Sequence, residues 1–318
     1  MVNIGIAGAY GAFGQKHLDA LDNIPDAKVT TIFGPDKDKI EGLASERGIA
    51  KACSNFEDFL ASDVEAIILS TPTQLHAEQS IAAMRAGKHT FAETPMADSL
   101  ADALAMEEVQ KETGVVGMVG HVRRFNPSHQ WIKNRIDAGE FNIQQMGGQT
   151  FFFRRNNTNA NGGLRSWTDH LLWHHACHTI DLFMYQTGEM PLEVFGLQGP
   201  AHPDLGIALD MTIGMKTPSE KLCTLSLSFN NDGPFGTFFR YIGDTGTYIA
   251  HYDDLMDGRE NKIDLSGVAV SNNGIELIDR EFISAIQEGR EPNSSFAQGL
   301  AAMQVMQKLE DQMGVLKA

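Results

Sequence analysis

The first third of the chain alternates short apolar runs with amphipathic segments, and this pattern restricts the possible fold more than any other feature. Apolar runs occur at residues 2–8, 29–34, 65–71, 89–93 and 115–120. Segments with helical spacing of apolar residues separate them, at 14–21, 37–47, 75–87 and 101–114. Strands that alternate with helices form parallel sheets, because each helix returns the chain across the sheet. We therefore predict an α/β fold whose N-terminal part is a doubly wound parallel sheet of the Rossmann type.

The rest of the chain has a different pattern. After Gly120, strand-like runs follow one another with few helices between them, at 146–154, 192–199, 207–215, 222–230, 236–243 and 246–252. This pattern predicts an α+β domain with a large, mainly antiparallel open sheet. One helix is predicted from about Asp169 to Thr187, and two more close the chain. We expect a dinucleotide-binding domain at 1–120 and a substrate-binding and oligomerisation domain at 121–318.

Charge and cysteine content restrict the partners and the compartment. The net charge of −16 at pH 7 argues against binding to nucleic acid or to anionic membranes. No apolar run is long enough to span a bilayer, and the stretch "MVNIGIAGAY" lacks the basic region of a signal peptide. The three cysteines, Cys53, Cys177 and Cys223, are widely separated and suit reduced thiols. We therefore expect a cytoplasmic protein that acts on small molecules.

A glycine-rich loop, "GIAGAYGAFGQKH", follows the first apolar run. Its glycines Gly8, Gly11 and Gly14 are spaced G-x-x-G-x-x-G, close to the G-x-G-x-x-G dinucleotide fingerprint. Glycine lets the backbone approach a pyrophosphate, and the N-terminus of the next helix supplies N–H donors. A plain tight turn is the alternative, but the strand before and the helix after favour a nucleotide site. The residues expected to bind the cofactor here are Gly8, Tyr10, Gly11, Ala12 and Phe13.

The second apolar run ends in "TIFGPDKDK". A site selective for NAD usually has an acidic residue here, which binds the ribose hydroxyls. This chain has Gly34 instead, so a 2′-phosphate is not repelled, and Lys37 or Lys39 could pair with it. We predict NADP as the cofactor. NAD remains the alternative if Asp36 takes the acidic role.

Four motifs together resemble the Gfo/Idh/MocA oxidoreductase family over essentially the whole chain: "GAYGAFGQKH", "TPTQLHAEQSIAAMRAGKHTFAETP", "GHVRRFNP" and "HACHTIDLF". The resemblance implies a nicotinamide cofactor in the N-terminal domain. It also implies a substrate site in the C-terminal sheet, which often forms the oligomer interface. The residues that it places near the ribose and nicotinamide are Thr71, Pro72, Thr73, Leu75, His76, Glu93, Thr94 and Pro95. His76 could equally cap its helix.

The chain departs from the family pattern at two positions. The family's Glu-Lys-Pro has Thr94 at its centre here, so the usual catalytic lysine is missing. The family's Asp-x-Gly-x-His begins with His174 and ends with His178. The resemblance implies that His178 is the catalytic base, and a free histidine, with a pKa of about 6.5, suits that role near neutral pH.

Helical spacing brings further groups near this base. His170, His174, His178 and Asp181 are four, four and three residues apart, which places them near one face of a helix. We expect Asp181 to orient His178 and His174 to face the same site, with His175 off this face. Histidines at this spacing also occur as ordinary hydrogen-bonded residues, and an i,i+4 pair with a carboxylate can bind zinc. No further ligand pair at metal spacing supports zinc, so we predict no metal.

Arginines gather in the sequence before the histidines, as Arg123-Arg124, Arg154-Arg155 and Arg165. Arginine binds carboxylates through two parallel hydrogen bonds, so the cluster suits the small anionic dicarboxylate substrate that the resemblance implies. Successive residues on a strand face opposite ways, so at most one of Arg154 and Arg155 should reach it. Trp167 could stack on a planar ring. The expected substrate-binding residues are His121, Arg123, Arg124, Arg154, Arg165, Trp167 and Thr168.

Within the family, "FFFRRN", "RSWTDHLLWHH" and "LSLSFNNDGP" resemble a narrower group. The resemblance implies oxidation of a cyclic hemiacetal dicarboxylate with NADP during the breakdown of aromatic compounds. A hemiacetal hydroxyl is more acidic than a simple alcohol, so a histidine suffices without the lysine. A sugar or polyol dehydrogenase and a non-catalytic NADP-binding regulator remain alternatives. The apolar stretches "FFF" and "SLSF" on a sheet face predict a homo-oligomer, a dimer, through the C-terminal sheet.

Overall fold

The computed structural model describes residues 1–158, 162–165, 168–269 and 274–314. The chain forms two compact units. Unit 1 contains residues 1–120 and 275–300, and unit 2 contains residues 121–274 and 301–318. Trp167 lies outside the described residues. Among the described helices, none combines the length and apolar character needed to cross a membrane.

Unit 1 is built on a six-stranded sheet in the order β3-β2-β1-β4-β5-β6, and every neighbouring pair is parallel. The strands are β1 Val2–Ala7, β2 Ala27–Phe33, β3 Lys51–Cys53, β4 Ala66–Leu69, β5 His89–Ala92 and β6 Gly117–Val119. This strand order is that of the dinucleotide-binding fold, in which ligands bind at the carboxyl ends of the strands. The predicted doubly wound parallel sheet is confirmed.

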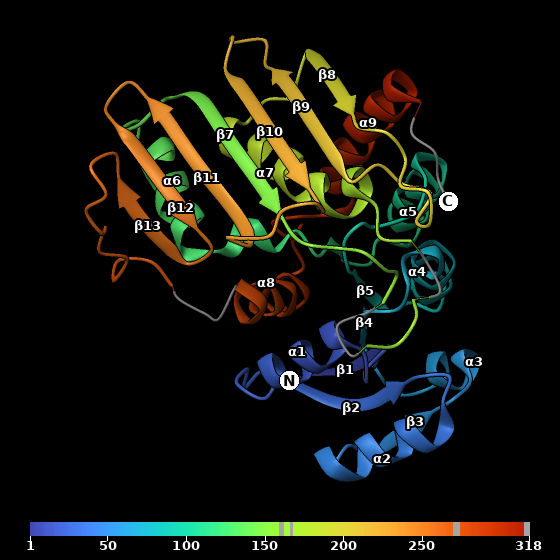
Figure 1. Cartoon of the computed structure of the whole chain (residues 1–318). Coiled ribbons are helices and arrows are strands. Elements are labelled where there is room, and N and C mark those ends of the chain that lie inside the picture. Colours follow the sequence, from blue (N-terminus) through green and yellow to red (C-terminus); the bar gives the residue numbers. More distant parts are fainter. Residues whose placement is uncertain (159–161, 166–167, 270–273, 315–318) are drawn as a thin grey trace. The chain divides into compact units, whose positions relative to one another are not determined.

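The helices of unit 1 connect these strands and cover the sheet (Figure 1). They are α1 Ala12–Leu21, α2 Lys37–Arg47, α3 Phe56–Leu60, α4 His76–Arg85, which follows the 3₁₀ turn η1 Thr73–Leu75, and α5 Leu100–Thr113. Helix α8, Ile275–Glu288, joins this unit from the far end of the sequence. Its Phe282 ring packs against that of Phe91 in β5, with ring centroids 5.7 Å apart, so α8 contributes to the core of the parallel-sheet unit.

Unit 2 contains a seven-stranded sheet in the order β13-β12-β11-β7-β10-β9-β8 (Figure 1). The strands are β7 Ile143–Phe151, β8 Glu193–Gln198, β9 Asp210–Lys216, β10 Leu222–Ser228, β11 Gly236–Gly243, β12 Thr247–His251 and β13 Asp254–Asp257. All pairs are antiparallel except β7 with β10, which is parallel. The predicted mainly antiparallel sheet is therefore confirmed.

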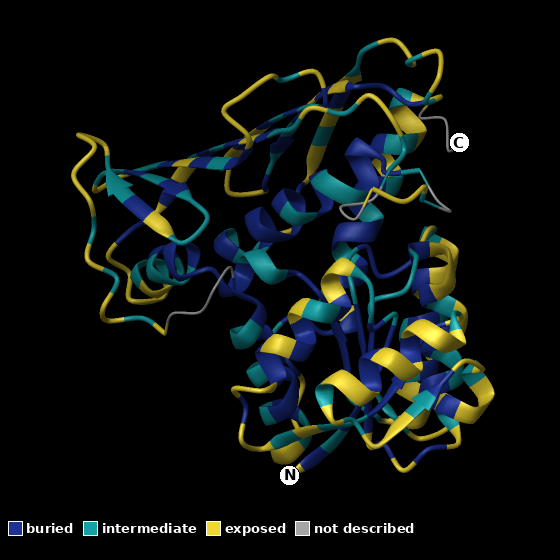
Figure 2. Cartoon of the chain, turned by 60° about the horizontal axis from the view of Figure 1, so that its bottom comes forward, coloured by how far each residue is buried: buried dark blue, intermediate teal, exposed yellow. Residues whose placement is uncertain are grey.

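One face of this sheet is covered by helices and the other is exposed. Helices α6, Pro127–Asp137, and α7, Cys177–Thr187, pack on the covered face. Along β9 and β10 buried and more exposed residues alternate, as Figure 2 shows by colour, which is the pattern of a half-covered antiparallel sheet. On the other face Phe195, Leu197 and Leu222 are exposed. The last helix, α9 Phe296–Met313, contributes residues to both units.

The helix predicted at Asp169–Thr187 requires correction. The segment begins with a π-helical stretch, η3, at Leu171–Ala176, and becomes α-helical only at Cys177. His170 is the N-cap, and its Nδ1 accepts a hydrogen bond from Leu172 N–H at 3.1 Å. The predicted α-helix is therefore wrong before Cys177, but His170 and His174 remain neighbours, because His174 N–H donates to the His170 carbonyl oxygen at 3.0 Å. Helix α6 and the 3₁₀ turn η2, Val122–Phe125, were not predicted.

Candidate active site

The glycine loop lies between β1 and α1 in unit 1. Gly8 has φ +78°, and a Cβ there would lie 2.5 Å from the Ser70 carbonyl oxygen. A Cβ on Gly14 would lie 2.4 Å from the Gly8 carbonyl oxygen. Gly11 is the N-cap of α1, and in the described chain no side chain caps this helix. The loop therefore presents backbone N–H groups at a helix N-terminus, the arrangement that binds a pyrophosphate.

The end of β2 is shaped by Tyr10 and by the first turn of α2. A Cβ on Gly34 would lie 2.3 Å from Cε1 of Tyr10, so the glycine makes room for the ring. Asp36 is the N-cap of α2, where its Oδ1 accepts from Lys39 N–H at 3.2 Å and its Oδ2 pairs with Lys39 Nζ at 2.9 Å. These bonds to Lys39 lower the pKa of Asp36. The Nζ of Lys37 lies 3.8 Å from Oε1 of Glu41, one turn further along the same helix.

His76 joins two turns that follow neighbouring strands. Its Nδ1 lies 2.9 Å from the Pro95 carbonyl oxygen, and its Nε2 lies 2.8 Å from that of Thr71. Burial lowers the pKa of His76. Thr71 Oγ1 donates to Gln79 Oε1 at 2.6 Å. His76 does not cap α4, whose N-cap is Leu75; it holds the loops after β4 and β5 together.

Glu93, directly after β5, is held on both carboxylate oxygens. Oε1 lies 2.9 Å from Nε2 of His17, and Oε2 accepts the Thr94 N–H at 3.0 Å. His17 in turn lies 2.8 Å from Asp279 of α8 through Nδ1. Sequence reasoning missed His17 and Asp279. The only available signal for His17 was its place three residues after Gly14, and Asp279 offered none.

The histidine segment of unit 2 lies along η3 and the start of α7. His178 is half-buried, and its Nδ1 is enclosed with no hydrogen-bond partner among the described residues. Burial lowers the pKa of His178 well below 6.5, and the charge of Arg123 adds to this effect. His178 is therefore neutral near pH 7, the form that can accept a proton. His174 Nδ1 accepts from His170 N–H at 3.0 Å, and the ring of His121 lies 6.4 Å from that of His178.

Asp181 does not orient His178, which corrects the prediction. Its carboxylate accepts two hydrogen bonds from Arg124, from Nε at 2.8 Å and from Nη2 at 2.6 Å. The side chain of Asp181 is fully buried and that of Arg124 nearly so, and His121 Nε2 lies 3.8 Å from Asp181 Oδ1. Burial makes an unpaired carboxylate costly, so Asp181 requires the guanidinium. Arg124 thus binds a residue of its own chain in this structure.

Arg154 and Arg165 converge on one buried carboxylate, Asp169. Arg154 Nη2 lies 2.6 Å from Asp169 Oδ2, and Arg165 Nη1 lies 3.3 Å from the same oxygen. His175 Nε2 lies 2.9 Å from Asp169 Oδ1. Burial raises the pKa of Asp169, but His175 and Arg154 outweigh burial and hold it well below the usual value. We call these four residues the Asp169 cluster; Asp169 was missed and His175 was predicted to lie off the site.

The remaining predicted substrate residues lie around this segment. Arg123 is half-buried; its guanidinium lies 4.8 Å from the centre of the Tyr252 ring, and its Nη2 donates to Thr237 Oγ1 at 3.4 Å. Burial lowers the pKa of Arg123. Arg155 is exposed, whereas Arg154 is half-buried, so only Arg154 joins the Asp169 cluster. Thr168, which precedes Asp169 in the sequence, is half-buried.

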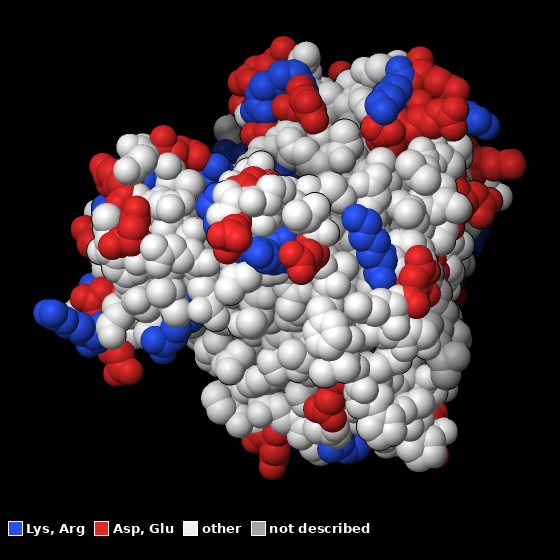
Figure 3. All heavy atoms as spheres, turned by 90° about the horizontal axis from the view of Figure 1, so that it is seen from above, with Lys and Arg blue, Asp and Glu red and all other residues white. Residues whose placement is uncertain are grey.

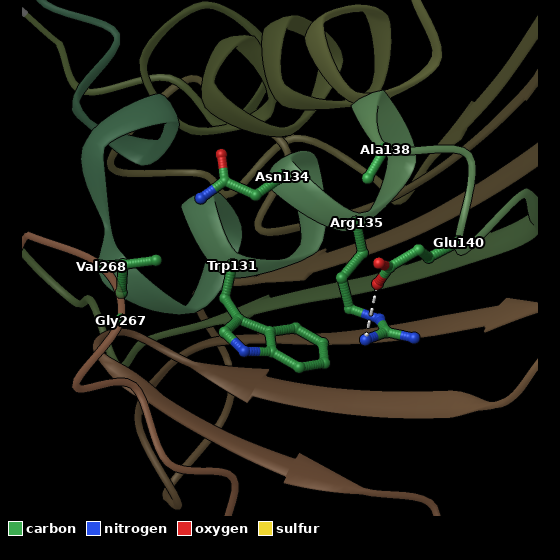
Figure 4. A pocket seen from close by; sticks show the side chains of 7 residues that line it. All are labelled: Trp131, Asn134, Arg135, Ala138, Glu140, Gly267 and Val268. Atoms are coloured by element: carbon green, nitrogen blue, oxygen red, sulfur yellow. Dashed lines mark ion pairs between the residues drawn. The ribbon is translucent and has the colours of Figure 1, made fainter.

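Two surface features lie apart from these residues. A hollow of about 330 Å³ is lined by Trp131, Asn134, Arg135, Ala138, Glu140, Gly267 and Val268; in Figure 4 Arg135 points to Glu140, with which it pairs at 3.0 Å. None of the predicted site residues lines it. On the face that Figure 3 shows, acidic and basic side chains are interspersed around a broad uncharged area.

Within the described part of the chain, no group of three His, Cys, Asp or Glu residues is placed to hold a metal.

Comparison with known proteins identifies the class. Residues 2–121 match the Gfo/Idh/MocA family described as "Oxidoreductase family, NAD-binding Rossmann fold", and residues 127–269 match "Bacterial oxidoreductases, C-terminal". The chain belongs to the Gfo/Idh/MocA oxidoreductase family, as the sequence motifs predicted. It is an oxidoreductase with a nicotinamide cofactor.

A relative matches it over nearly its full length. The chain is 57% identical, over 98% of its own length and 99% of the relative's, to 4-carboxy-2-hydroxymuconate-6-semialdehyde dehydrogenase of Sphingobium sp. (strain NBRC 103272 / SYK-6). Among solved structures, levoglucosan dehydrogenase in complex with NADH and levoglucosan has a TM-score of 0.87 at 20% identity, covering 98% of this chain and 97% of that one. UDP-N-acetylglucosamine 3-dehydrogenase GnnA from Acidithiobacillus ferrooxidans has a TM-score of 0.84 at 20% identity, with the same coverage. These two similarities support the fold.

Proposed function

We propose that this enzyme oxidises the cyclic hemiacetal of 4-carboxy-2-hydroxymuconate-6-semialdehyde to 2-pyrone-4,6-dicarboxylate with NADP. The observation that carries the proposal is the Asp169 cluster, which presents two arginines beside the histidine segment of unit 2. A neutral sugar gives no use for paired guanidinium groups, whereas a dicarboxylate does. The 57% identity to a dehydrogenase of that semialdehyde supports the same substrate. In this proposal unit 1 binds the cofactor and unit 2 the substrate.

The chemistry requires a hydride acceptor and a proton acceptor. A nicotinamide held by the glycine loop and the loops after β4 and β5 would supply the hydride acceptor for the hemiacetal carbon. His178 takes the hydroxyl proton, and the carbon becomes the ring carbonyl of the pyrone. The low pKa of His178 makes it a weak base, but it is neutral and ready to accept a proton, and a hemiacetal hydroxyl is easier to deprotonate than a simple alcohol. Thr94 cannot supply the charge of the missing lysine, so in this proposal the arginines provide the positive charge.

Three features of the β2 end support NADP as the cofactor. No carboxylate stands at Gly34, where it would repel a 2′-phosphate. Asp36 is occupied by Lys39 through its side chain and through the α2 cap. Lys39 Nζ lies 5.9 Å from the centre of the Tyr10 ring, so a cation stands at this end of the sheet. Each lysine has a carboxylate neighbour, Asp36 for Lys39 and Glu41 for Lys37. Lys39 is the better candidate for the phosphate, because it is the lysine that lies near the Tyr10 ring at the end of β2.

We also propose a homodimer through the exposed face of the seven-stranded sheet. Phe195, Leu197 and Leu222 are 55%, 59% and 44% exposed on that face. Apolar side chains gathered on one face are typical of a covered interface. Light scattering would give the mass in solution, and Leu197→Glu should lower it to that of one chain. A single-chain mass for the parent enzyme would contradict the proposal.

The test of the activity is spectrophotometric. The ring-cleavage semialdehyde of protocatechuate is generated in situ, the enzyme is added, and the absorbance of reduced cofactor is followed with NADP and with NAD. We expect rapid reduction, faster with NADP, and no reduction with neutral sugars such as levoglucosan or an inositol. Reduction with sugars alone would favour the sugar dehydrogenase. No reduction with any substrate, in protein shown to be folded, would favour the non-catalytic regulator.

A further inference from the structure

Unit 1 contains a buried cluster of three ionisable groups, His17, Glu93 and Asp279. Nδ1 of His17 lies 2.8 and 3.0 Å from the two oxygens of Asp279, and Nε2 lies 2.9 Å from Glu93 Oε1. His17 and Asp279 are fully buried, and the Glu93 side chain is 14% exposed. Each ring nitrogen of His17 therefore faces a carboxyl group, an arrangement that the doubly protonated ring satisfies by donating to two ionised carboxylates.

The charges of the cluster depend on one another. Burial lowers the pKa of His17, but Asp279 and Glu93 outweigh it and raise the pKa from 6.5 to about 10. Burial raises the pKa of Asp279, and His17 opposes that effect. An imidazolium between two carboxylates compensates one of the two negative charges. A buried ion pair contributes little net stability, because desolvation offsets the attraction, so stability alone does not explain the cluster.

The position of Glu93 suggests what the cluster does. Strand registers place Ala7, Leu69 and Ala92 side by side at the carboxyl ends of β1, β4 and β5. Glu93 thus follows β5 two strands away from the glycine loop, roughly 10 Å along the sheet edge, and on the side opposite β2. In this strand order the second nucleotide of a dinucleotide binds on that side, which for NADP is the nicotinamide nucleotide.

The carboxylate of Glu93 also fixes the backbone that follows it. Oε2 accepts the Thr94 N–H at 3.0 Å, and a Cβ on Gly120 would lie 2.6 Å from this oxygen, so Gly120 lets the carboxylate approach. Thr94 occupies the position of the missing lysine, and its Oγ1 is enclosed with no hydrogen-bond partner among the described residues. The turn at Glu93-Thr94 is therefore held by His17 and carries a polar group that none of these contacts uses.

We propose that His17 and Asp279 are positioning residues, which hold the Glu93-Thr94 turn in the conformation that binds the nicotinamide nucleotide of the cofactor. Asp279 holds the imidazolium, the imidazolium holds Glu93, and Glu93 holds the turn. Neither His17 nor Asp279 touches the cofactor in this proposal. It rests on the nicotinamide cofactor of the proposed function but not on the identity of the substrate.

The experiment measures cofactor binding without substrate, by titrating the full-length enzyme with NADPH and following its fluorescence. His17→Gln keeps a hydrogen-bonding side chain but removes the cation between the two carboxylates. We expect NADPH binding to weaken by about tenfold, the effect of losing one charge-assisted hydrogen bond. Arg290→Gln is the matched control. Arg290 pairs at 2.6 Å with Glu281 of α8, the helix that carries Asp279, but this contact lies outside the cluster, so binding should change by less than about twofold.

A pH series separates positioning from a general loss of stability. The groups that face His17 are Asp279 and Glu93, and Glu276 acts on Asp279. In the parent enzyme NADPH affinity should stay constant from about pH 6 to 9 and fall as the pH approaches the His17 pKa of about 10. Asp279→Asn removes the partner that raises this pKa most, so the fall should begin at a lower pH. In His17→Gln the NADPH affinity should not show this fall with rising pH.

Two outcomes would overturn the proposal. One is unchanged NADPH affinity in His17→Gln with only a lower melting temperature, which would make the cluster purely structural. The other, which decides the matter if His17→Gln does not fold, is an affinity profile of Asp279→Asn with the same pH dependence as the parent. Because no hemiacetal enters the assay, a wrong substrate assignment would leave these results unaffected.

Discussion

The substitution Arg154→Lys tests whether the Asp169 cluster binds the substrate carboxylate. The guanidinium of Arg154 lies between Asp169, 2.6 Å from Nη2, and the Phe229 ring, whose centre is 4.6 Å away. Its Nη1 is enclosed and makes no hydrogen bond within the described residues. A lysine at this position can keep the ion pair with Asp169, but it has no second nitrogen to offer. The substitution therefore removes Nη1, the donor that we propose binds the substrate carboxylate, and keeps the charge.

The size of the effect follows from that lost donor. A hydrogen bond to a charged group contributes about 1.5–3 kcal/mol, so kcat/KM for the hemiacetal dicarboxylate should fall by about 10- to 150-fold. The affinity for NADPH should not change, because the cluster lies in unit 2. The assay is the rate of cofactor reduction at several substrate concentrations, with cofactor binding measured separately by fluorescence.

Arg155→Lys is the matched control for this prediction. Arg155 is the next residue, is exposed, and uses Nη1 for the backbone carbonyls of Arg154 and Phe229, at 2.7 and 3.1 Å. We expect its kcat/KM to stay within about twofold of the parent, as is usual for exposed charges. Equal losses in the two variants would refute the reasoning, since a general loss of positive charge would then explain both. An unchanged Arg154→Lys would refute it directly.

Three further outcomes are expected. Asp169→Asn leaves two arginines without their buried counter-charge, so the free energy of unfolding should fall by about 3 kcal/mol in urea titrations at pH 7. Because the pKa of Asp169 is lowered in the folded chain, its contribution to stability is present above the unfolded pKa of about 3.9 and is lost as the pH falls below that value. The free energies of unfolding of parent and variant should therefore converge in acid. His178→Asn should lower kcat by about 10²- to 10⁴-fold with NADPH affinity unchanged, and equal kcat would exclude His178 as the base. Lys39→Ala should weaken NADP binding by about two- to fivefold and leave NAD binding as it is, whereas parallel losses would place the 2′-phosphate elsewhere.

The fold could be predicted because its signals are local. In unit 1 each strand and helix has its own periodicity, and alternation of the two types implies a parallel sheet. Helix α6 was missed because "PSHQWIKNRID" contains only three large apolar residues, Trp131, Ile132 and Ile136, among polar ones. The π-helical start of the histidine segment was also missed, since sequence periodicity does not distinguish a π-helix over so few residues.

The site could be predicted only as a set of residue types. Arginines, histidines and a glycine loop were visible, but their pairing was not. Arg124 and Asp181 are 57 residues apart; Arg124 was expected to bind the substrate and Asp181 to orient His178, yet they bind each other. Asp169 looked like one acidic residue among many, because what distinguishes it is burial between Arg154 and His175, a property of the folded chain.

The bond between His17 and Asp279 joins residues 262 positions apart, and this separation affects how the protein is made. A growing chain that has reached Gly120 already contains all six strands of the parallel sheet but not α8. At about 5–20 residues per second, the ribosome needs roughly 8–34 s more to complete residue 288. During that interval His17 lacks the carboxylate of Asp279, and Phe91 lacks the ring of Phe282. The nascent first unit is therefore incomplete, with an uncovered apolar surface that chaperones and proteases can reach until α8 has been made.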